Sequence, residues 1–418
     1  MQPSSIKDHG LRVLPALAVV TLVVAACAPP ASGRARFTPD FPAPTGAGLV
    51  RPWAALNQVP KVAANQPMAD ALAKATDLVV IKDNDGAWVP MFRAANPAVT
   101  ILVYHNGTFA LKGQESTFPE DWYAHDATGA KLVQPEFGNT LMDVSNADWV
   151  NHVVAECQAD IALTGADGCY TDMLMTAPLF ANYLTGGPPI NRATGKPWTF
   201  GDYQHAIEAI ADRVAAVPGP NAANGVANGN RWFATGGGSS KTLTDHIDAA
   251  HAEIWLRTSQ LKPNQFPTVE NWKQDLDLVV QAEAEHRVVL LETKLWGTAT
   301  TALRDRWRQF TLATYLLGAQ GQSTWYLFTS DRTFNGMANA VADPWLDTPV
   351  GTPVGGYAQP AGGAYVRAFS TGYVAVNPGA TALSVTLPAG KWRTLTGQVR
   401  SGTVSLAAHT GAVWVKAS

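Results

Sequence analysis

From residue 77 onward the chain alternates short apolar, β-branched runs with longer segments whose apolar residues recur at intervals of three and four. This alternation predicts parallel strands joined by helices. The helical pattern is clearest at 149–163, 203–217, 269–285 and 302–318. Eight strands are expected at 78–83, 101–106, 141–144, 168–172, 226–228, 252–255, 288–293 and 324–328.

Eight such units over about 260 residues match the size of a (β/α)8 TIM barrel. An open doubly wound sheet is the alternative, although no glycine-rich dinucleotide fingerprint follows the first strand. After Pro344 the helical pattern stops, and short alternating runs separated by Gly, Pro and Asn predict a small antiparallel β-sandwich. The expected fold class is therefore α/β, with a barrel at 51–342 and a C-terminal β domain at 343–418.

Residues 1–26 have the form of a secretory signal, because Lys7 and Arg12 precede an apolar run that closes on small residues. The residues that end at Cys27 resemble a bacterial lipoprotein lipobox, in which the cysteine is lipidated; an ordinary cleavage site beside a coincidental cysteine is the alternative. We expect an exported protein, lipid-anchored to the bacterial cell membrane on its extracytoplasmic face. The proline-rich segment 27–50 is expected to be an extended tether.

Charged residues make up 15% of the chain and the net charge is −3, so the positive surface that nucleic acid requires is not expected. Cys157 and Cys169 are either a disulfide in an oxidising compartment or two small buried hydrophobic residues. His105, His125 and His251 are scattered, and no HExxH or CxxC motif occurs. We therefore expect no metal and no cofactor. The oligomeric state is left open.

Acidic and hydrogen-bonding residues stand at the carboxyl ends of the expected strands, where barrel enzymes build their active sites. Period-two alternation along 168–172 puts Asp172 last on the inward face. Glu253 and Glu292 lie within apolar runs, where an ionisable group is costly unless it is paired or used. We predict Asp172 and Glu253 as catalytic residues. The residues expected to bind substrate are Lys82, Tyr104, Asn106, Trp122, Asp143, Tyr170, Asn228 and Glu292.

Two carboxyl groups across a sugar are the minimum for glycoside hydrolysis. We expect an apolar setting to raise the pKa of Glu253, as a general acid needs, and hydrogen-bond donors to keep Asp172 ionised as the nucleophile. The sequence leaves the carboxyl separation open, and we favour retention over inversion. Structural roles are the alternatives: Asp172 as a helix cap, and Glu253 as an ion-pair partner of Lys294 or Arg257.

Four segments resemble the hypothetical glycoside-hydrolase-like TIM-barrel proteins related to the endo-α-1,4-polygalactosaminidase group. They are 103–107 (VYHNG), 121–129 (DWYAHDATG), 141–145 (LMDVS) and 165–172 (GADGCYTD), and the last is the most specific. The resemblance implies a glycosidase-type site with Asp172 and Glu253 as its carboxyl groups. In relatives further acidic residues often follow the aspartate, whereas Met173, Leu174 and Met175 follow it here.

The function expected from these features is that of a lipid-anchored, extracytoplasmic glycoside hydrolase acting on a polysaccharide or oligosaccharide. The first alternative is a carbohydrate-binding surface lipoprotein on a barrel that has lost catalysis. A second is a lyase or amidohydrolase, in which Lys294 beside Glu292 would form a Schiff base.

Overall fold

The computed structural model describes Phe41, residues 49–361 and residues 363–417. These residues belong to one compact unit. Cys27, the expected signal 1–26 and most of the expected tether lie outside the described residues, so the lipid anchor stays a prediction. No helix in the described part of the chain is both long enough and apolar enough to cross a membrane.

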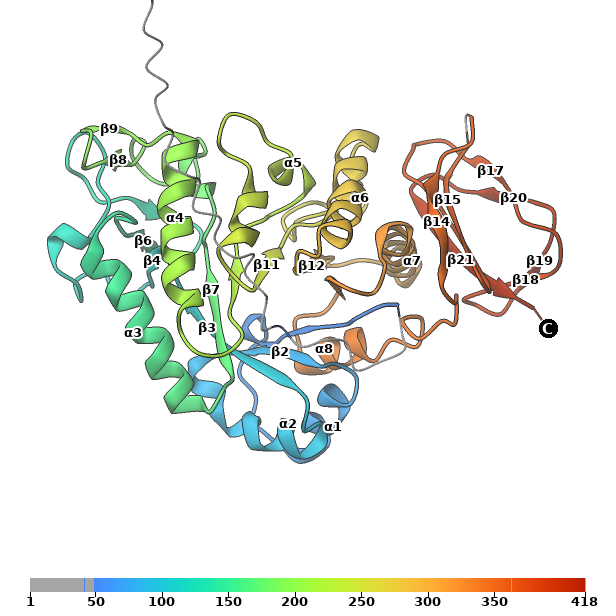
Figure 1. Cartoon of the computed structure of the whole chain (residues 1–418), viewed down its shortest axis with the longest axis horizontal. Coiled ribbons are helices and arrows are strands. Elements are labelled where there is room, and N and C mark those ends of the chain that lie inside the picture. The colour runs from blue at the N-terminus through green and yellow to red at the C-terminus, as the bar shows by residue number, and fades with distance from the viewer. Residues whose placement is uncertain (1–40, 42–48, 362, 418) are drawn as a thin grey trace, which may run out of the picture. The chain divides into compact units, whose positions relative to one another are not determined.

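Eight parallel strands form a closed barrel surrounded by helices (Figure 1). The ring closes between its first and last strands, where Tyr326 N donates to Arg51 O at 2.8 Å and Pro52 pairs with Tyr326. This closure confirms the TIM barrel and rules out the open doubly wound sheet. In barrel order the strands are β1 (Ala54–Ala55), β2 (Leu78–Ile81), β3 (Thr100–Asn106), β7 (Gly168–Asp172), β10 (Ala222–Asn224), β11 (Ala249–Ala252), β12 (Val289–Lys294) and β13 (Thr324–Thr329).

The longer helices begin at side chains that accept a hydrogen bond from the first turn, which satisfies N–H groups that have no partner within the helix. These caps are Asn146 for α3, Thr199 for α4, Thr268 for α6 and Thr300 for α7. The helices are α1 (Gln66–Ala73), α2 (Val89–Ala95), α3 (Ala147–Thr164), α4 (Phe200–Ala215), α5 (Gly229–Trp232), α6 (Val269–Ala284), α7 (Thr301–Gly318) and α8 (Phe334–Val341).

Three of the expected strands differ from the structure. The segment 141–144 is not a barrel strand, because β6 (Asn139–Leu141) pairs with β4 (Phe109–Ala110) and β5 (Val133–Gln134) in a small antiparallel sheet within the connection from β3 to α3. The strand that replaces it in the barrel is β1. The strand expected at 226–228 does not form, and β10 at Ala222–Asn224 takes its place. The strand expected at 252–255 ends earlier, at Ala252, so Glu253 directly follows its strand. A further hairpin pairs β8 (Ile190–Asn191) with β9 (Lys196–Pro197).

Antiparallel strands after α8 form the expected C-terminal β-sandwich. Arg367 is almost fully buried and donates from Nη1 to the carbonyls of Leu316 and Ala319, at 3.0 and 2.7 Å. It thereby satisfies carbonyl groups at the end of α7. One sheet has the order β14 (Pro353–Ala358), β15 (Tyr365–Phe369), β16 (Gly372–Asn377), β21 (Thr410–Lys416), β18 (Trp392–Thr394) and β19 (Val399–Arg400), and the other pairs β17 (Leu383–Thr386) with β20 (Thr403–Leu406).

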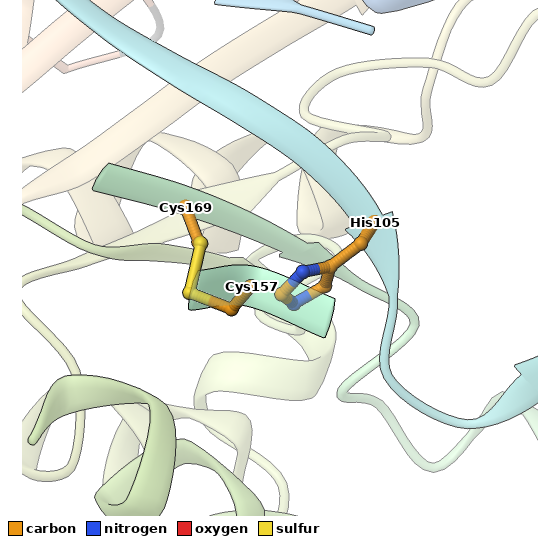
Figure 2. A group of neighbouring side chains, drawn as sticks. All are labelled: His105, Cys157 and Cys169. Atoms are coloured by element: carbon orange, nitrogen blue, oxygen red, sulfur yellow. A yellow bond between two sulfur atoms is a disulfide. The ribbon is translucent and has the colours of Figure 1, made fainter. Parts of the chain in front are cut away.

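Cys157 of α3 and Cys169 of β7 form a disulfide, with their Cα atoms 5.8 Å apart (Figure 2). This decides between the two alternatives that the sequence left open. His105 of β3 lies beside the two sulfur atoms, and its Nε2 is 2.7 Å from Thr171 Oγ1. Burial lowers the pKa of His105 to about 3, so the ring is neutral. Among the described residues, His105, Cys157 and Cys169 are the one group whose side chains have the composition of a metal site. The two sulfur atoms of this group are bonded to each other in the disulfide.

Replacing Cys157 and Cys169 together with alanine is expected to lower the free energy of unfolding by about 2–4 kcal/mol. The bond restricts the unfolded chain, and it ties α3 to the strand that carries Asp172. Urea unfolding of the double variant and of the oxidised parent chain measures the effect. An unchanged unfolding midpoint, with thiol titration showing the parent chain oxidised, would contradict the expectation.

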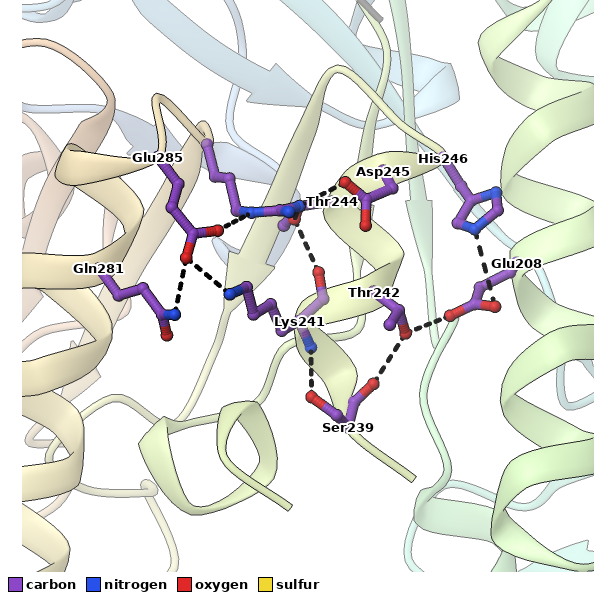
Figure 3. Close-up of polar contacts among 10 residues, drawn as sticks. Glu208, Ser239, Lys241, Thr242, Thr244, Asp245, His246, Gln281 and Glu285 are labelled. Carbon is purple, nitrogen blue, oxygen red and sulfur yellow. Dashed lines mark hydrogen bonds and ion pairs between the residues drawn. The ribbon is translucent and has the colours of Figure 1, made fainter. Parts of the chain in front are cut away.

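A polar network between α4 and α6 holds the 3-10 helix η5 (Ser240–Asp245) (Figure 3). At its centre, Glu285 accepts hydrogen bonds from Lys241, Gln281 and Arg287, each at 2.7 Å. The network joins three segments that are separate in the sequence. Its other members are Glu208, Ser239, Thr242, Thr244, Asp245 and His246.

Burial opposes the charge of Glu285, but its three donors together lower its pKa from 4.5 to about 2. A carboxyl group whose pKa is lower in the folded state stabilises the fold above its ordinary pKa and loses this effect as the pH falls toward 2. Glu285→Gln is therefore expected to cost roughly 1 kcal/mol of unfolding free energy at pH 7, since partly exposed ion pairs are screened by solvent, and much less at pH 2. Thermal unfolding at both pH values measures this. Equal destabilisation at both would contradict it.

Candidate active site

Inward side chains at the carboxyl ends of neighbouring strands form the candidate active site. Because alternate residues of a strand point to the same face, four of the strands contribute one residue at the mouth of the barrel and another one step below it, and β10 contributes an upper residue alone. The upper residues are Asn106 of β3, Asp172 of β7, Asn224 of β10, Glu253 after β11 and Lys294 of β12. The lower residues are Tyr104, Tyr170, His251 and Glu292.

A single amide nitrogen joins the two predicted catalytic carboxyl groups. Asn224 Nδ2 donates to Asp172 Oδ1 at 2.8 Å and to Glu253 Oε2 at 2.7 Å. The two carboxyl groups therefore face each other across strand β10, which lies between β7 and β11. Asp172 also accepts a hydrogen bond from its neighbour's backbone, Met173 N, at 2.8 Å.

Lys294 forms an ion pair with Glu253 and a second one with Glu292. Its Nζ contacts Glu253 Oε1 and lies 3.3 Å from Glu292 Oε2. The lysine side chain is 5% exposed and that of Glu253 is 31% exposed, so the cation lies beneath a carboxylate that can still be reached. Burial opposes the charge of Lys294, but Glu253 and Glu292 outweigh it and raise the pKa of Lys294.

The charges of the two carboxyl groups are the reverse of the expectation from the sequence. Burial opposes ionisation of Glu253, but Lys294 and His251, with hydrogen bonds from Lys294 and Asn224, lower the pKa of Glu253 to about 2. Burial and the negative charge of Glu253 raise the pKa of Asp172, although Asn224 and Tyr104 donate to it. Glu253 is therefore the more readily ionised member of the pair. The expected rise in the pKa of Glu253 was wrong, whereas the assignment of acid and nucleophile stays a prediction.

Aromatic and ionisable side chains form a buried layer below the pair. The hydroxyl group of Tyr170 is hydrogen-bonded to His251 Nδ1, and His251 Nε2 is 3.2 Å from Glu292 Oε2. Gln58 Nε2 also donates to Glu292 Oε2, at 2.9 Å. Among the described residues, Asn224 Oδ1 and Glu292 Oε1 are buried polar atoms without a hydrogen bond. Buried polar atoms are nearly always hydrogen-bonded, so these two acceptors mark where a ligand hydroxyl or a water molecule would bind.

Tyr104 and Asn106, both predicted to bind substrate, lie beside Asp172. The hydroxyl group of Tyr104 donates to Asp172 Oδ2 at 2.8 Å. Burial and the charge of Asp172 raise the pKa of Tyr104, so the phenol keeps its proton. Asn106 is paired with Asp172 in the sheet register, and its Oδ1 accepts from Phe109 N at 2.8 Å, which shapes the turn after β3.

Four other residues that were predicted to bind substrate make contacts elsewhere. In the part of the chain that the structure describes, none of them has a hydrogen bond or ion pair with Asp172 or Glu253. Their contacts are Lys82 with the Val59 carbonyl at 2.6 Å, Trp122 stacked on Phe118 at 5.7 Å between ring centroids, Asp143 with Arg192 at 3.2 Å, and Asn228 as the cap of α5.

Asn224 and His251 were not predicted as site residues. Asn224 ends an apolar run, Ala222–Asn224, so its position at a strand end was the signal that could have found it. His251 lies two residues before Glu253, hence on the same face of the strand. The sequence had offered Lys294 and Arg257 as alternative ion-pair partners of Glu253. Lys294 is that partner. Arg257 instead donates from Nε to Lys294 O at 2.8 Å.

A closed barrel with two carboxyl groups facing each other at its mouth has the arrangement that glycoside hydrolysis requires. The model of hypothetical glycosyl hydrolase family 15 matches residues 93–373, and the chain belongs to that family. The match includes β7, β10, β11 and β12, and therefore all the upper residues of the site. A search of curated proteins gave no match.

Solved structures with a similar fold include a trehalulose synthase mutant in complex with Tris, at 12% identity and a TM-score of 0.50, covering 88% of this chain and 98% of that one. The glycoside hydrolase domain of PelA from Pseudomonas aeruginosa has 14% identity and a TM-score of 0.42, with 68% and 95% covered. A cycloalternan-forming enzyme from Listeria monocytogenes has 14% identity and a TM-score of 0.43. The alignment covers 88% of this chain and 41% of the Listeria enzyme, so this chain spans less than half of its length. At these identities the likeness concerns the fold.

Proposed function

We propose that the chain hydrolyses O-glycosidic bonds of a polysaccharide or oligosaccharide with retention of configuration. The observation that carries this proposal is the pair of hydrogen bonds from Asn224 Nδ2 to Asp172 and Glu253. Because both oxygens bind the same nitrogen, the two nearest carboxyl oxygens are at most about 5.5 Å apart. This upper limit supports the separation of about 5–5.5 Å in retaining glycosidases over the ~6.5–9.5 Å in inverting ones.

The ion pair with Lys294 supports Glu253 as the nucleophile, because it favours the ionised carboxylate. The carboxylate of Glu253 attacks the anomeric carbon while Asp172 gives its proton to the leaving oxygen, so the glycosidic bond breaks as a glycosyl ester forms. Asp172 then takes a proton from a water molecule, which attacks the anomeric carbon and releases Glu253. Tyr104 and Asn224 hold Asp172 in place through both steps.

Schiff-base chemistry at Lys294 is disfavoured by the same ion pairs. A lysine that forms a Schiff base reacts as a neutral amine, which requires a lowered pKa. Burial alone would lower the pKa of Lys294, but Glu253 and Glu292 raise it. This ammonium group is suited to stabilising a carboxylate rather than to attacking a carbonyl carbon.

We also propose that the protein is exported and carries a lipid on Cys27, which would keep the barrel near envelope or extracellular glycans. The support is the sequence alone: an apolar run that closes on small residues directly before a cysteine. Membrane fractionation of the full-length chain tests this. The chain is expected in the membrane fraction, and Cys27→Ser is expected to release it.

The catalytic proposal is tested by incubating the purified chain with a panel of bacterial and plant polysaccharides and measuring new reducing ends. The parent chain is expected to release reducing ends from at least one polymer, and NMR of the first product is expected to show the anomer of the substrate. Binding of a polymer without release of reducing ends, unchanged in Asp172→Asn, would favour the alternative of a non-catalytic carbohydrate-binding lipoprotein. An inverted first product would reject the retaining mechanism.

A further inference from the structure

The loop between Glu253 and α6 is fixed to the barrel by buried contacts. Arg257 is 2% exposed and donates from Nε to Lys294 O at 2.8 Å and from Nη1 to Lys262 O at 3.3 Å. Trp307 of α7 donates from its indole nitrogen to Pro263 O at 2.7 Å. Through Arg257 the loop is therefore bound to the backbone of Lys294, whose ammonium group contacts Glu253.

The C-terminal β domain clamps the same loop through an aromatic stack. The ring of Phe266 lies between Trp307 and His409, with centroid distances of 4.1 and 4.9 Å and interplanar angles of 5° and 6°. His409 belongs to the turn between β20 and β21, and its ring nitrogen Nδ1 is 2.8 Å from Pro378 O. Arg306 lies over Phe266 and donates to His409 O at 3.1 Å. One turn of the β domain therefore holds the loop that follows a catalytic residue.

The other end of this loop reaches across the mouth of the barrel. Gln260 Nε2 donates to Glu136 Oε2 at 2.8 Å, and Glu136 lies in the turn between β5 and β6. This turn belongs to the connection that follows β3, whereas Gln260 follows β11, and β7 and β10 lie between those strands in the barrel. The contact therefore spans the side of the mouth where Asp172 and Asn224 are placed.

The turn that carries Glu136 is also close to the catalytic pair. Burial and the charges of Asp172, Glu253 and Glu136 all raise the pKa of Tyr183, so the three carboxyl groups act on the same phenol. The hydroxyl group of Tyr183 in turn lies 3.7 Å from Met173 Sδ, beside Asp172. The Glu136–Gln260 contact is therefore a bridge near the pair rather than a remote surface contact.

We propose that the C-terminal β domain completes the substrate site: by clamping Phe266 it holds the loop 253–268 against the β5–β6 turn, so that the loop and the turn enclose a bound sugar chain. This inference rests on the proposed glycosidase function and extends it to a domain that carries no catalytic group. Phe266 and His409 are then positioning residues, and Glu136 and Gln260 are substrate-enclosing residues. We expect binding of substrate, rather than the chemical step, to depend on them.

The test compares Phe266→Ala, Gln260→Ala and the control Tyr357→Phe in the full chain. Tyr357 also links the β domain to the barrel, by a 2.8 Å hydrogen bond to Asp277 of α6, but it does not touch the loop. With oligosaccharides prepared from the polymer that the chain cleaves, both loop variants are expected to raise KM about tenfold with kcat within about twofold of the parent chain. The control is expected to match the parent chain.

Amide hydrogen exchange gives a second readout that needs no substrate. Phe266→Ala is expected to speed exchange within 256–266 at least tenfold and to leave β7 and β12 unchanged, whereas Tyr357→Phe leaves the loop unchanged. Parent-like exchange of the loop in Phe266→Ala, or a parent-like KM in both loop variants, would overturn the inference. If no polysaccharide is cleaved, the proposed function fails, and exchange of the loop in His409→Ala, which removes only the β-domain side of the stack, still decides whether the domain holds the loop.

Discussion

Glu253→Gln is expected to lower kcat by at least about 10⁴-fold, because the amide cannot form the glycosyl ester on which both steps depend. The loss is expected with every substrate, including aryl glycosides whose leaving group needs no protonation. The variant should fold, since glutamine keeps the shape of the side chain and its one amide oxygen can still accept from Lys294 Nζ, although the hydrogen bond from Asn224 Nδ2 is lost. Initial rates on the cleaved polymer and on an activated aryl glycoside measure the effect.

Asp172→Asn serves as the matched comparison, because it changes the other carboxyl group of the same pair. It is expected to lose about 10²–10⁴-fold on the natural substrate, where protonation of the leaving oxygen is required. With an aryl glycoside of low leaving-group pKa, the first step is expected to stay near the parent rate. If Asp172→Asn were equally inactive on both substrates and Glu253→Gln retained the activated one, the two roles would be reversed.

Lys294→Met is the second change with a large expected effect. Lys294 supplies the strongest interaction that favours the charge of Glu253, against the burial that opposes it. Without the ammonium group the pKa of Glu253 rises, so a larger fraction of the enzyme has a protonated nucleophile at a given pH. The acidic limb of kcat/KM, set by a pKa of about 2 in the parent chain, is expected to move to higher pH by at least about two units. Activity at pH 3, one unit above the parent limb, is expected to fall about tenfold.

The pH profile of kcat/KM for Lys294→Met measures this shift. Lys241→Met is the control, because it removes a lysine from an ion pair with Glu285 outside the barrel mouth. That control is expected to lose stability without moving the acidic limb. The basic limb reports deprotonation of Asp172, whose pKa is raised, and Lys294→Met is not expected to remove it. An acidic limb that stays in place in Lys294→Met would contradict the assigned role of the lysine.

The position of Asp172 and Glu253 at the barrel mouth could be predicted because it depends on local patterns. Asp172 ends an apolar strand on the inward face, and Glu253 is a charged residue directly after an apolar run. In a barrel, both features place a side chain at the mouth without any knowledge of the neighbouring strands. The same reasoning anticipated Tyr104, which contacts Asp172, and Tyr170 and Glu292, which line the layer below.

The position of the fifth strand could not be predicted because the sequence offers two nearly identical choices. Ala222–Asn224 and residues 226–228 are both short apolar runs that end in asparagine. The pairing of Ala222 with Tyr170 on one side and Ala249 on the other selects the first run. Asn228 was therefore predicted as the site residue of this strand, a position that Asn224 occupies. The first strand, β1, was missed because two residues carry no recognisable period.

The opposite pKa shifts of Asp172 and Glu253 could not be predicted because they depend on contacts between strands. The expected apolar setting of Glu253 took account of burial alone. Lys294 lies 41 positions away in the sequence, and only the register of β11 against β12 brings its ammonium group to Glu253. The register between two strands depends on how the whole barrel packs, and the residue pattern of a single strand does not specify it.

Mass spectrometry of a trapped glycosyl-enzyme tests directly whether Glu253 is the nucleophile. Asp172→Asn lacks the general base of the second step, so an ester formed from an activated aryl glycoside should accumulate before hydrolysis. After acid quenching and proteolysis, we expect one added glycosyl mass on the peptide that contains Glu253. We expect none when Glu253→Gln is combined with Asp172→Asn. An adduct on any other residue, or inverted product without an adduct, would contradict this role of Glu253.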